Sequence, residues 1–171
     1  MRPRTDVASR AVRGRRRRSF VALLAGIAAA GYLGGSSAGA RETACTAGVH
    51  NVGGVKVRTF CGPAKATAHV SGKTFHFHGG KCELSGGYFT VNIGSITIAG
   101  PGVKPKFSYL GIDVKPPRPG LHHNQVVSWS VPGKGYTLFG ATVTVKSGLK
   151  GGTFTGHLIV GGNGSGSFSC S

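Results

Sequence analysis

Apolar and polar residues alternate along most of the chain after residue 54, and this period of two predicts strands. The clearest case is TLFGATVTVK, residues 137–146, in which Ala141, Val143 and Val145 alternate with polar residues. We therefore predict an all-β fold, an antiparallel β-sandwich or curled sheet of roughly ten short strands. The segments expected to form strands or hairpins are residues 55–60, 65–80, 87–100, 107–114, 125–131, 137–146, 152–160 and 164–170.

Glycine and proline mark the breaks between these segments. The 31 glycines among 171 residues fall between the alternating runs, as expected of turns and bulges. Loops are expected at residues 100–102 (GPG) and 115–120 (KPPRPG), because proline is excluded from a central strand. Residues 121–124 (LHHN) should be exposed. The lone Trp129 is expected in the core rather than as a ligand platform, because a small domain needs its large apolar area inside.

The first 40 residues predict an export signal. Eight arginines and one aspartate precede an apolar run at residues 21–33. The sequence RRSFV at residues 17–21 fits the twin-arginine form, and AGA at residues 38–40 is a small-x-small cleavage site. The apolar run is shorter than the ~20 residues of a spanning helix, which disfavours an uncleaved anchor. Cleavage after Ala40 would leave a single secreted domain, residues 41–171, without a stable membrane span.

The charge of residues 41–171 excludes several function classes. These residues include ten lysines, three arginines and three carboxylates (Glu42, Glu83 and Asp113), which gives a formal net charge of +10. The lysines are scattered, whereas nucleic-acid readers cluster cations beside stacking aromatics, so no specific nucleic-acid partner is expected. The carboxylates are far apart in sequence, and no G-x-S-x-G motif occurs within residues 41–171. We therefore expect no enzymatic activity.

Four cysteines, Cys45, Cys61, Cys82 and Cys170, follow the signal. An even number of cysteines in an exported chain indicates two disulfides, and the absence of C-x-x-C disfavours a zinc cluster. Of the three pairings we favour Cys45 with Cys61 and Cys82 with Cys170. The second bond would close a long loop and stabilise the domain more.

A histidine-bearing hairpin is the one candidate metal site. A Gly72–Lys73 turn would pair His69 with His76 and place His69, His76 and His78 on one face. Three imidazoles so arranged could bind zinc or copper weakly. The alternative is a solvated polar face without a ligand.

Four cations lie in or beside the two proline-bearing loops: Lys104, Lys106, Lys115 and Arg118. If both loops emerge at one end of the sheet, these side chains share a partner, such as an anionic cell-envelope polymer or a surface protein. A general solubilising charge is the alternative. The domain is expected to be a monomer.

The second half of the chain resembles a known family. Cys82 is followed by GGYFTVNIG, then by GYTLFGATVTV, and Cys170 lies beside the C-terminus. This order is similar to that of the nineteen-kilodalton lipoprotein antigen (LpqH) family of mycobacteria, over about residues 81–171. The resemblance implies a β-rich cell-envelope antigen, a Cys82–Cys170 disulfide and no catalysis. The chain lacks the lipobox, so tethering by a lipid does not carry over. The function expected is a secreted, envelope-associated β-domain that acts by surface contact, antigen-like or adhesion-like.

Overall fold

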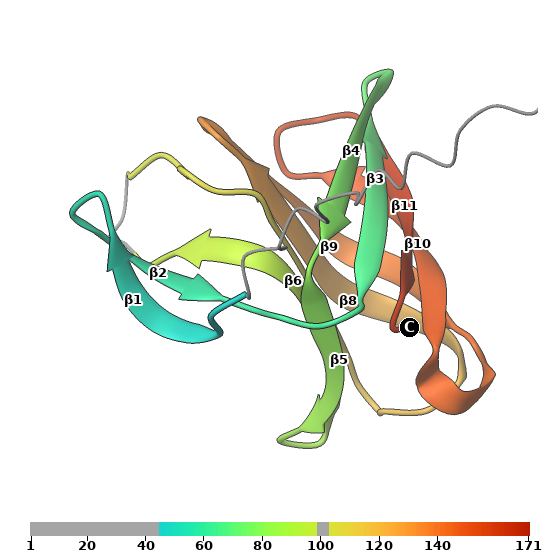
Figure 1. Cartoon of the computed structure of the whole chain (residues 1–171). Coiled ribbons are helices and arrows are strands. Elements are labelled where there is room, and N and C mark those ends of the chain that lie inside the picture. Colours follow the sequence, from blue (N-terminus) through green and yellow to red (C-terminus); the bar gives the residue numbers. More distant parts are fainter. Residues whose placement is uncertain (1–44, 99–102) are drawn as a thin grey trace, which may run out of the picture. The chain divides into compact units, whose positions relative to one another are not determined.

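The computed structural model describes residues 45–98 and 103–171, which form one antiparallel sheet of eleven strands (Figure 1). The predicted export signal and the predicted loop at residues 100–102 lie outside the described residues. Within the described ranges there is no helix whose length and apolar character would let it cross a membrane. The strands are β1 (Gly48–Val52), β2 (Val55–Thr59), β3 (Lys65–Val70), β4 (Lys73–His78), β5 (Gly80–Ser85), β6 (Tyr88–Thr97), β7 (Tyr109–Val114), β8 (Gly120–Val131), β9 (Lys134–Val145), β10 (Gly151–Leu158) and β11 (Asn163–Ser169), with one short 3-10 turn, η1 (Ser147–Leu149).

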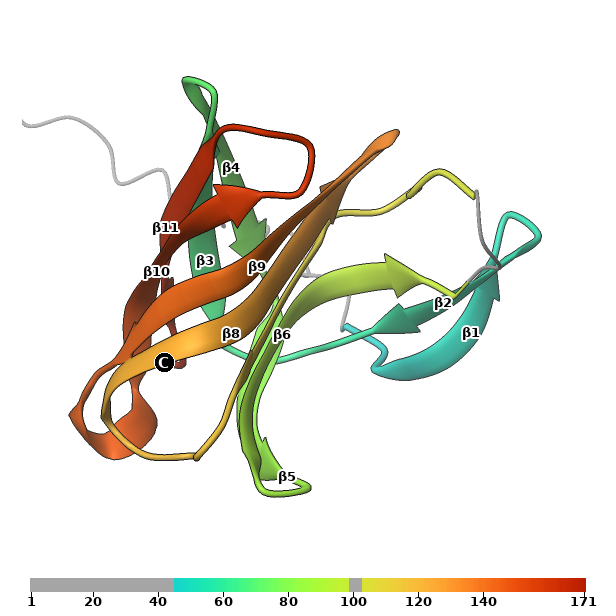
Figure 2. The same ribbon diagram turned by 180° about the vertical axis from the view of Figure 1, so that it is seen from behind.

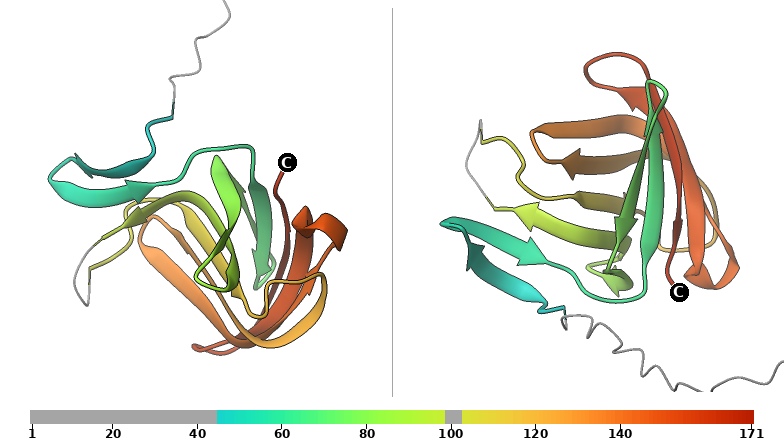
Figure 3. Two further views of the ribbon diagram at one scale, coloured as in Figure 1. Left: turned by 90° about the horizontal axis from the view of Figure 1, so that it is seen from below. Right: turned by 45° about the horizontal axis from the view of Figure 1, so that its top comes forward.

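The all-β prediction is confirmed, and the sheet takes the curled form. Its strands follow the order β1-β2-β6-β7-β8-β9-β10-β11-β3-β4. Strands β5 and β2 lie along one edge of β6, β5 beside its first half and β2 beside its second. The Gly94 N–H donates to the carbonyl of Gly79 (2.9 Å), the single residue between β4 and β5. The end of β4, the last strand in this order, therefore lies beside β6, and the sheet curls back on itself. Figures 2 and 3 show this curl from behind and from two further directions.

A single core fills the inside of the curl. Inward residues of β3, β4 and β6–β11 form one cluster of buried side chains, and polar residues alternate with them on the outer face. Trp129 is 2% exposed and stacks on Tyr136, with ring centroids 5.2 Å apart. Burying one such aromatic side chain contributes at most about 4 to 6 kcal/mol. The prediction that Trp129 is a core residue is confirmed.

The prediction for residues 121–124 is wrong at His122. This segment belongs to β8, and His122 is 5% exposed, paired with Val143 of β9. A register shift between His122 and Gln125 leaves one extra residue in β8, and Asn124 there has φ of 59°. Such a bulge re-aims side chains, so His122 faces inward and Leu121 remains exposed. The His122 ring Nε2 is hydrogen-bonded to the Arg118 carbonyl oxygen (2.9 Å).

Candidate functional site

The two loops that carry the predicted cations lie at opposite ends of β7. One loop precedes Tyr109, the first residue of β7, and the other follows Val114, its last. Successive connections in an antiparallel sheet alternate between its two ends. The expected common surface of Lys104, Lys106, Lys115 and Arg118 is therefore wrong, and these residues form two separate pairs.

At the first end, other lysines join Lys104 and Lys106. The Gly133 N–H donates to the carbonyl of Pro105 (2.7 Å), and Gly133 directly precedes Lys134. On the other side, the Ile98 N–H donates to the Lys56 carbonyl (2.8 Å), and the Lys106 N–H donates to Thr97 Oγ1 (3.3 Å). All four lysine residues are exposed. We call Lys56, Lys104, Lys106 and Lys134 the loop-end lysines.

At the second end, the charge is mixed. The Lys115 ammonium lies 5.0 Å from the centre of the Tyr88 ring, in a cation–π contact. Lys115 follows β7 by one residue, and the carboxylate of Asp113 is on that same strand. The second carboxylate in the described part of the chain, Glu83, lies one strand beyond β6 at the same level. Both described carboxylates are thus nearer to Lys115 and Arg118 than to the loop-end lysines.

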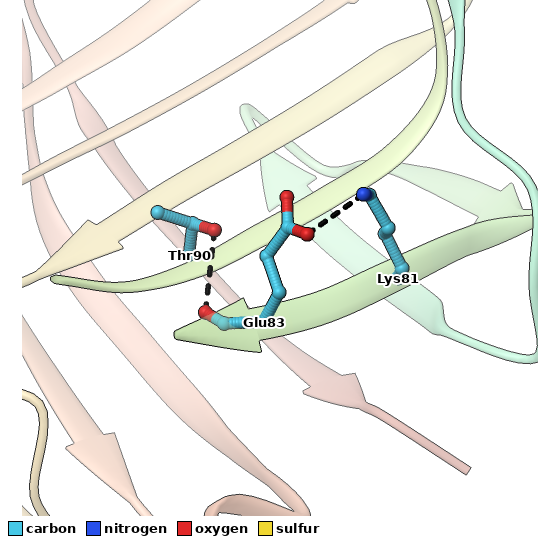
Figure 4. Close-up of polar contacts among 3 residues, drawn as sticks. All are labelled: Lys81, Glu83 and Thr90. Carbon is cyan, nitrogen blue, oxygen red and sulfur yellow. Dashed lines mark hydrogen bonds and ion pairs between the residues drawn. The ribbon is translucent and has the colours of Figure 1, made fainter. Parts of the chain in front are cut away.

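Glu83 and Asp113 share a row that the sequence did not indicate. Thr90 of β6 pairs with Glu83 of β5 on one side and with Asp113 of β7 on the other. Glu83 is held by Lys81, with Nζ to Oε2 at 2.7 Å, while Thr90 Oγ1 donates to the Glu83 backbone carbonyl at 3.3 Å (Figure 4). Both partners of the ion pair are well exposed, so it contributes at most about 1 kcal/mol. Two residues of like charge are thus brought to the outer face on the two strands that flank β6, with Thr90 between them.

Tyr109 lies in the next part of this outer face. Its phenol donates to Asn92 Oδ1 (2.6 Å), and its ring is 5.8 Å from that of Phe60. Burial, together with the nearby Asp113 carboxylate, raises the pKa of Tyr109 to about 12, against a smaller opposing effect of Arg58. Partial burial also raises the pKa of Asp113 above its usual range. Tyr109 therefore remains a neutral hydrogen-bond donor over the physiological range of pH.

The histidine hairpin differs from the prediction in its register. The turn is Ser71–Gly72, with φ of 48° and 72°, so His69 lies opposite Thr74 and His76 opposite Thr67. The face assignment is right, since His69, His76 and His78 are all exposed on the outer face. However, His69 Nδ1 is hydrogen-bonded to Thr74 Oγ1 (2.9 Å) and His76 Nδ1 to Thr67 Oγ1 (3.4 Å). In the described part of the chain, no three histidine, cysteine or acidic side chains are grouped to hold a metal ion.

Both predicted disulfides are confirmed. Cys45 is bonded to Cys61, with Cα atoms 5.8 Å apart, and Cys82 to Cys170, with Cα atoms 5.5 Å apart. The second bond joins β5 to the residue that follows β11. Cys82 and Cys170 also pack against the core.

Comparison with protein-family models, curated proteins and solved structures finds no match to this chain.

Proposed function

We propose that residues 41–171 act as a secreted, non-catalytic binding domain that contacts an anionic polymer of the cell envelope through the loop-end lysines. The observation that carries this proposal is the asymmetry of charge. Four exposed lysines gather at one end of the sheet, and both described carboxylates lie toward the other end. A surface with one sign of charge attracts a polyanion and raises its association rate.

The loop-end lysines are also held on ordered backbone. Hydrogen bonds from Gly133 to Pro105 and from Lys106 to Thr97 fix the segment that carries Lys104 and Lys106. A surface that is ordered before binding loses less conformational entropy when a partner arrives. Each exposed lysine contributes little alone, so a partner with repeated negative charges fits better than one with a single anionic group.

Three further features support an envelope location and a binding role. The predicted twin-arginine signal indicates export, and the two disulfides suit an oxidising compartment. Glu83 is occupied by Lys81, which disfavours it as a catalytic base. The resemblance to envelope lipoprotein antigens points to the same location.

Cosedimentation with purified envelope at about 50 and about 300 mM salt tests the proposal, because exposed charges are screened beyond ~8 Å at physiological ionic strength. The test variant is Lys104→Gln with Lys106→Gln, and Lys115→Gln with Arg118→Gln is the control of equal charge at the opposite end. We expect the first pair to weaken binding about fivefold, from roughly 0.5 kcal/mol per contact, and the second to have little effect.

Other outcomes are equally informative. Equal losses in both variants would mean that net charge alone causes adhesion. Salt-independent binding would indicate an apolar protein interface, and no binding at either salt concentration would refute the envelope contact. The intact mass of secreted protein tests the export step, since we expect a chain that begins at Arg41 without an acyl group.

A further inference from the structure

The outer face of five neighbouring strands carries two continuous rows of hydroxyl and imidazole side chains. Strands β9, β10, β11, β3 and β4 lie side by side (Figure 3), and their registers place one outward residue of each strand in each row. We call the ten residues of these rows the hydroxyl face. The first row is Thr144, Thr153, Ser167, Thr67 and His76, and the second is Thr142, Thr155, Ser165, His69 and Thr74.

The hydroxyl face contains neither a lysine or arginine nor a carboxylate. It belongs to a domain in which cations outnumber carboxylates by more than four to one. All ten residues are exposed or half-buried. Hydrogen-bonded threonine and serine pairs stabilise a sheet face across strands as pairs of opposite charge do, and these rows consist only of threonine, serine and histidine.

Hydrogen bonds across the strands orient the imidazoles of this face. The Nδ1 atoms of His69 and His76 are each engaged by a threonine hydroxyl of the facing strand. The Nε2 atom of each ring is the one that remains for a ligand. His123 of β8 continues the second row in the same way, with its Nδ1 atom 3.2 Å from Thr142 Oγ1.

An open hollow of about 550 Å³ adjoins the second row. A register shift between Thr155 and His157 forms the bulge beside it, and bulges bend a strand and change the direction of its side chains. Its volume is in the range of small-molecule sites, but its walls are polar where such sites are mostly apolar. The hollow is lined by Gly140, Thr142, Thr155, Gly156, His157, Asn163, Gly164 and Ser165.

We propose that the hydroxyl face binds a neutral polysaccharide, with the hollow accommodating one or two of its sugar residues. Hydroxyl groups both donate and accept hydrogen bonds, as sugar hydroxyls do, and neutral imidazoles supply one further donor or acceptor each. Neighbouring strands are ~4.8 Å apart, a distance close to the length of one sugar residue in an extended chain. A glycan that crosses the strands would therefore meet a fresh pair of side chains at each residue.

The chemistry of the face favours this partner over the alternatives. An anionic polymer would find no cation in the two rows. A protein interface would be expected to have buried aromatic or arginine anchors at its centre, and the rows contain neither phenylalanine, tyrosine, tryptophan nor arginine. This surface differs from the loop-end lysines in both place and chemistry, so the two proposals stand independently.

Affinity electrophoresis in gels that contain a soluble glucan, galactan, mannan or arabinan tests the proposal. Parallel pull-downs on the same polymers, immobilised, at about 0.5 M salt remove the contribution of the lysines by screening it. The test variant is Thr155→Val with Ser165→Ala. The matched control is Thr137→Val with Ser128→Ala, which removes the same groups from outside the rows.

We expect at least one polymer to retard the wild type and the control, and the test variant to bind roughly tenfold more weakly. In NMR titrations with an oligosaccharide of that polymer, the ring signals of His69 and His76 should shift, and those of His50 on β1 should not. Retardation by none of the four polymers would refute the proposal. Equal loss in test and control variants, or shifts confined to histidines away from the hydroxyl face and the hollow, such as His50, would also refute it.

Discussion

The two disulfides should differ in their contribution to stability, because they close loops of very different length. Cys82 and Cys170 are 88 residues apart, and Cys45 and Cys61 are 16 apart. Loss of loop-closure entropy in the unfolded chain then amounts to about 4.6 kcal/mol for the first bond and about 3.1 kcal/mol for the second. Cys82 and Cys170 also pack against the core, so replacing them removes contacts that the entropy model does not count.

Alanine replacement of each cysteine pair, followed by thermal unfolding without reductant, measures this difference. We expect the Tm to fall by about 15 °C when Cys82 and Cys170 are replaced, and by about 10 °C when Cys45 and Cys61 are replaced. Urea unfolding should give the same order. A Cys45–Cys61 variant that is the less stable of the two, or a Cys82–Cys170 variant with the Tm of the wild type, would show that loop length does not determine the contribution of these disulfides.

Three further predictions concern packing, ionisation and metal binding. A Cβ at Gly166 would overlap the Thr67 carbonyl and the Phe154 ring, so Gly166→Ala should cost at least about 2 kcal/mol in urea unfolding. Gly135→Ala should cost far less, because its Cβ would make only an ordinary contact with Pro105, at 3.9 Å. The alkaline absorbance titration should contain a step near pH 12 that Tyr109→Phe removes. Because the pKa of Tyr109 is raised, the stabilisation from its neutral phenol is present below pH 10 and is lost as the pH rises to about 12. In calorimetry at about pH 7.5, zinc should release no more heat with the wild type than with a His76→Ala, His78→Ala variant. The reason is that a threonine and a lysine, not further histidines, lie opposite these two residues. A larger heat with the wild type would show that the histidines do bind zinc.

Alternation of apolar and polar residues predicts most strands and their inward faces, because a strand with one buried face must repeat every two residues. Strand β5 was not predicted, because its residues do not alternate in this way. Its six residues, GKCELS, pair with β6 through a turn at Gly86 and Gly87, both with positive φ. The Gly86–Gly87 pair could have indicated this hairpin, since two adjacent glycines favour a two-residue turn between paired strands. With β5 in place, Glu83 comes to the level of Asp113, which composition and spacing alone did not show.

The error about the cationic loops has a simple geometric origin. Both loops adjoin one short strand, β7, and a strand has two ends. A pair of loops that flank a single strand of an antiparallel sheet can share a surface only if one of them folds back along the strand. Because one strand lies between Lys106 and Lys115 in the sequence, these two lysines are expected at opposite ends of that strand rather than in a common site. The lysines that join Lys104 and Lys106 come instead from the start of β9 and from β2, at distant sequence positions.

The register of the histidine hairpin shows why a face can be predicted when its chemistry cannot. Moving a two-residue turn by one position, from Gly72–Lys73 to Ser71–Gly72, changes every cross-strand partner by two residues. A change of two leaves each side chain on its original face, because strands alternate with that period. The hydrophobic pattern satisfies both registers equally, with Phe75 and Phe77 inward in each, and so it cannot choose between them. The outward partners do change: His69 faces Thr74 instead of His76. One residue in a turn thus decides whether this face presents opposed imidazoles suited to a metal ion or alternating hydroxyl and imidazole groups suited to a sugar.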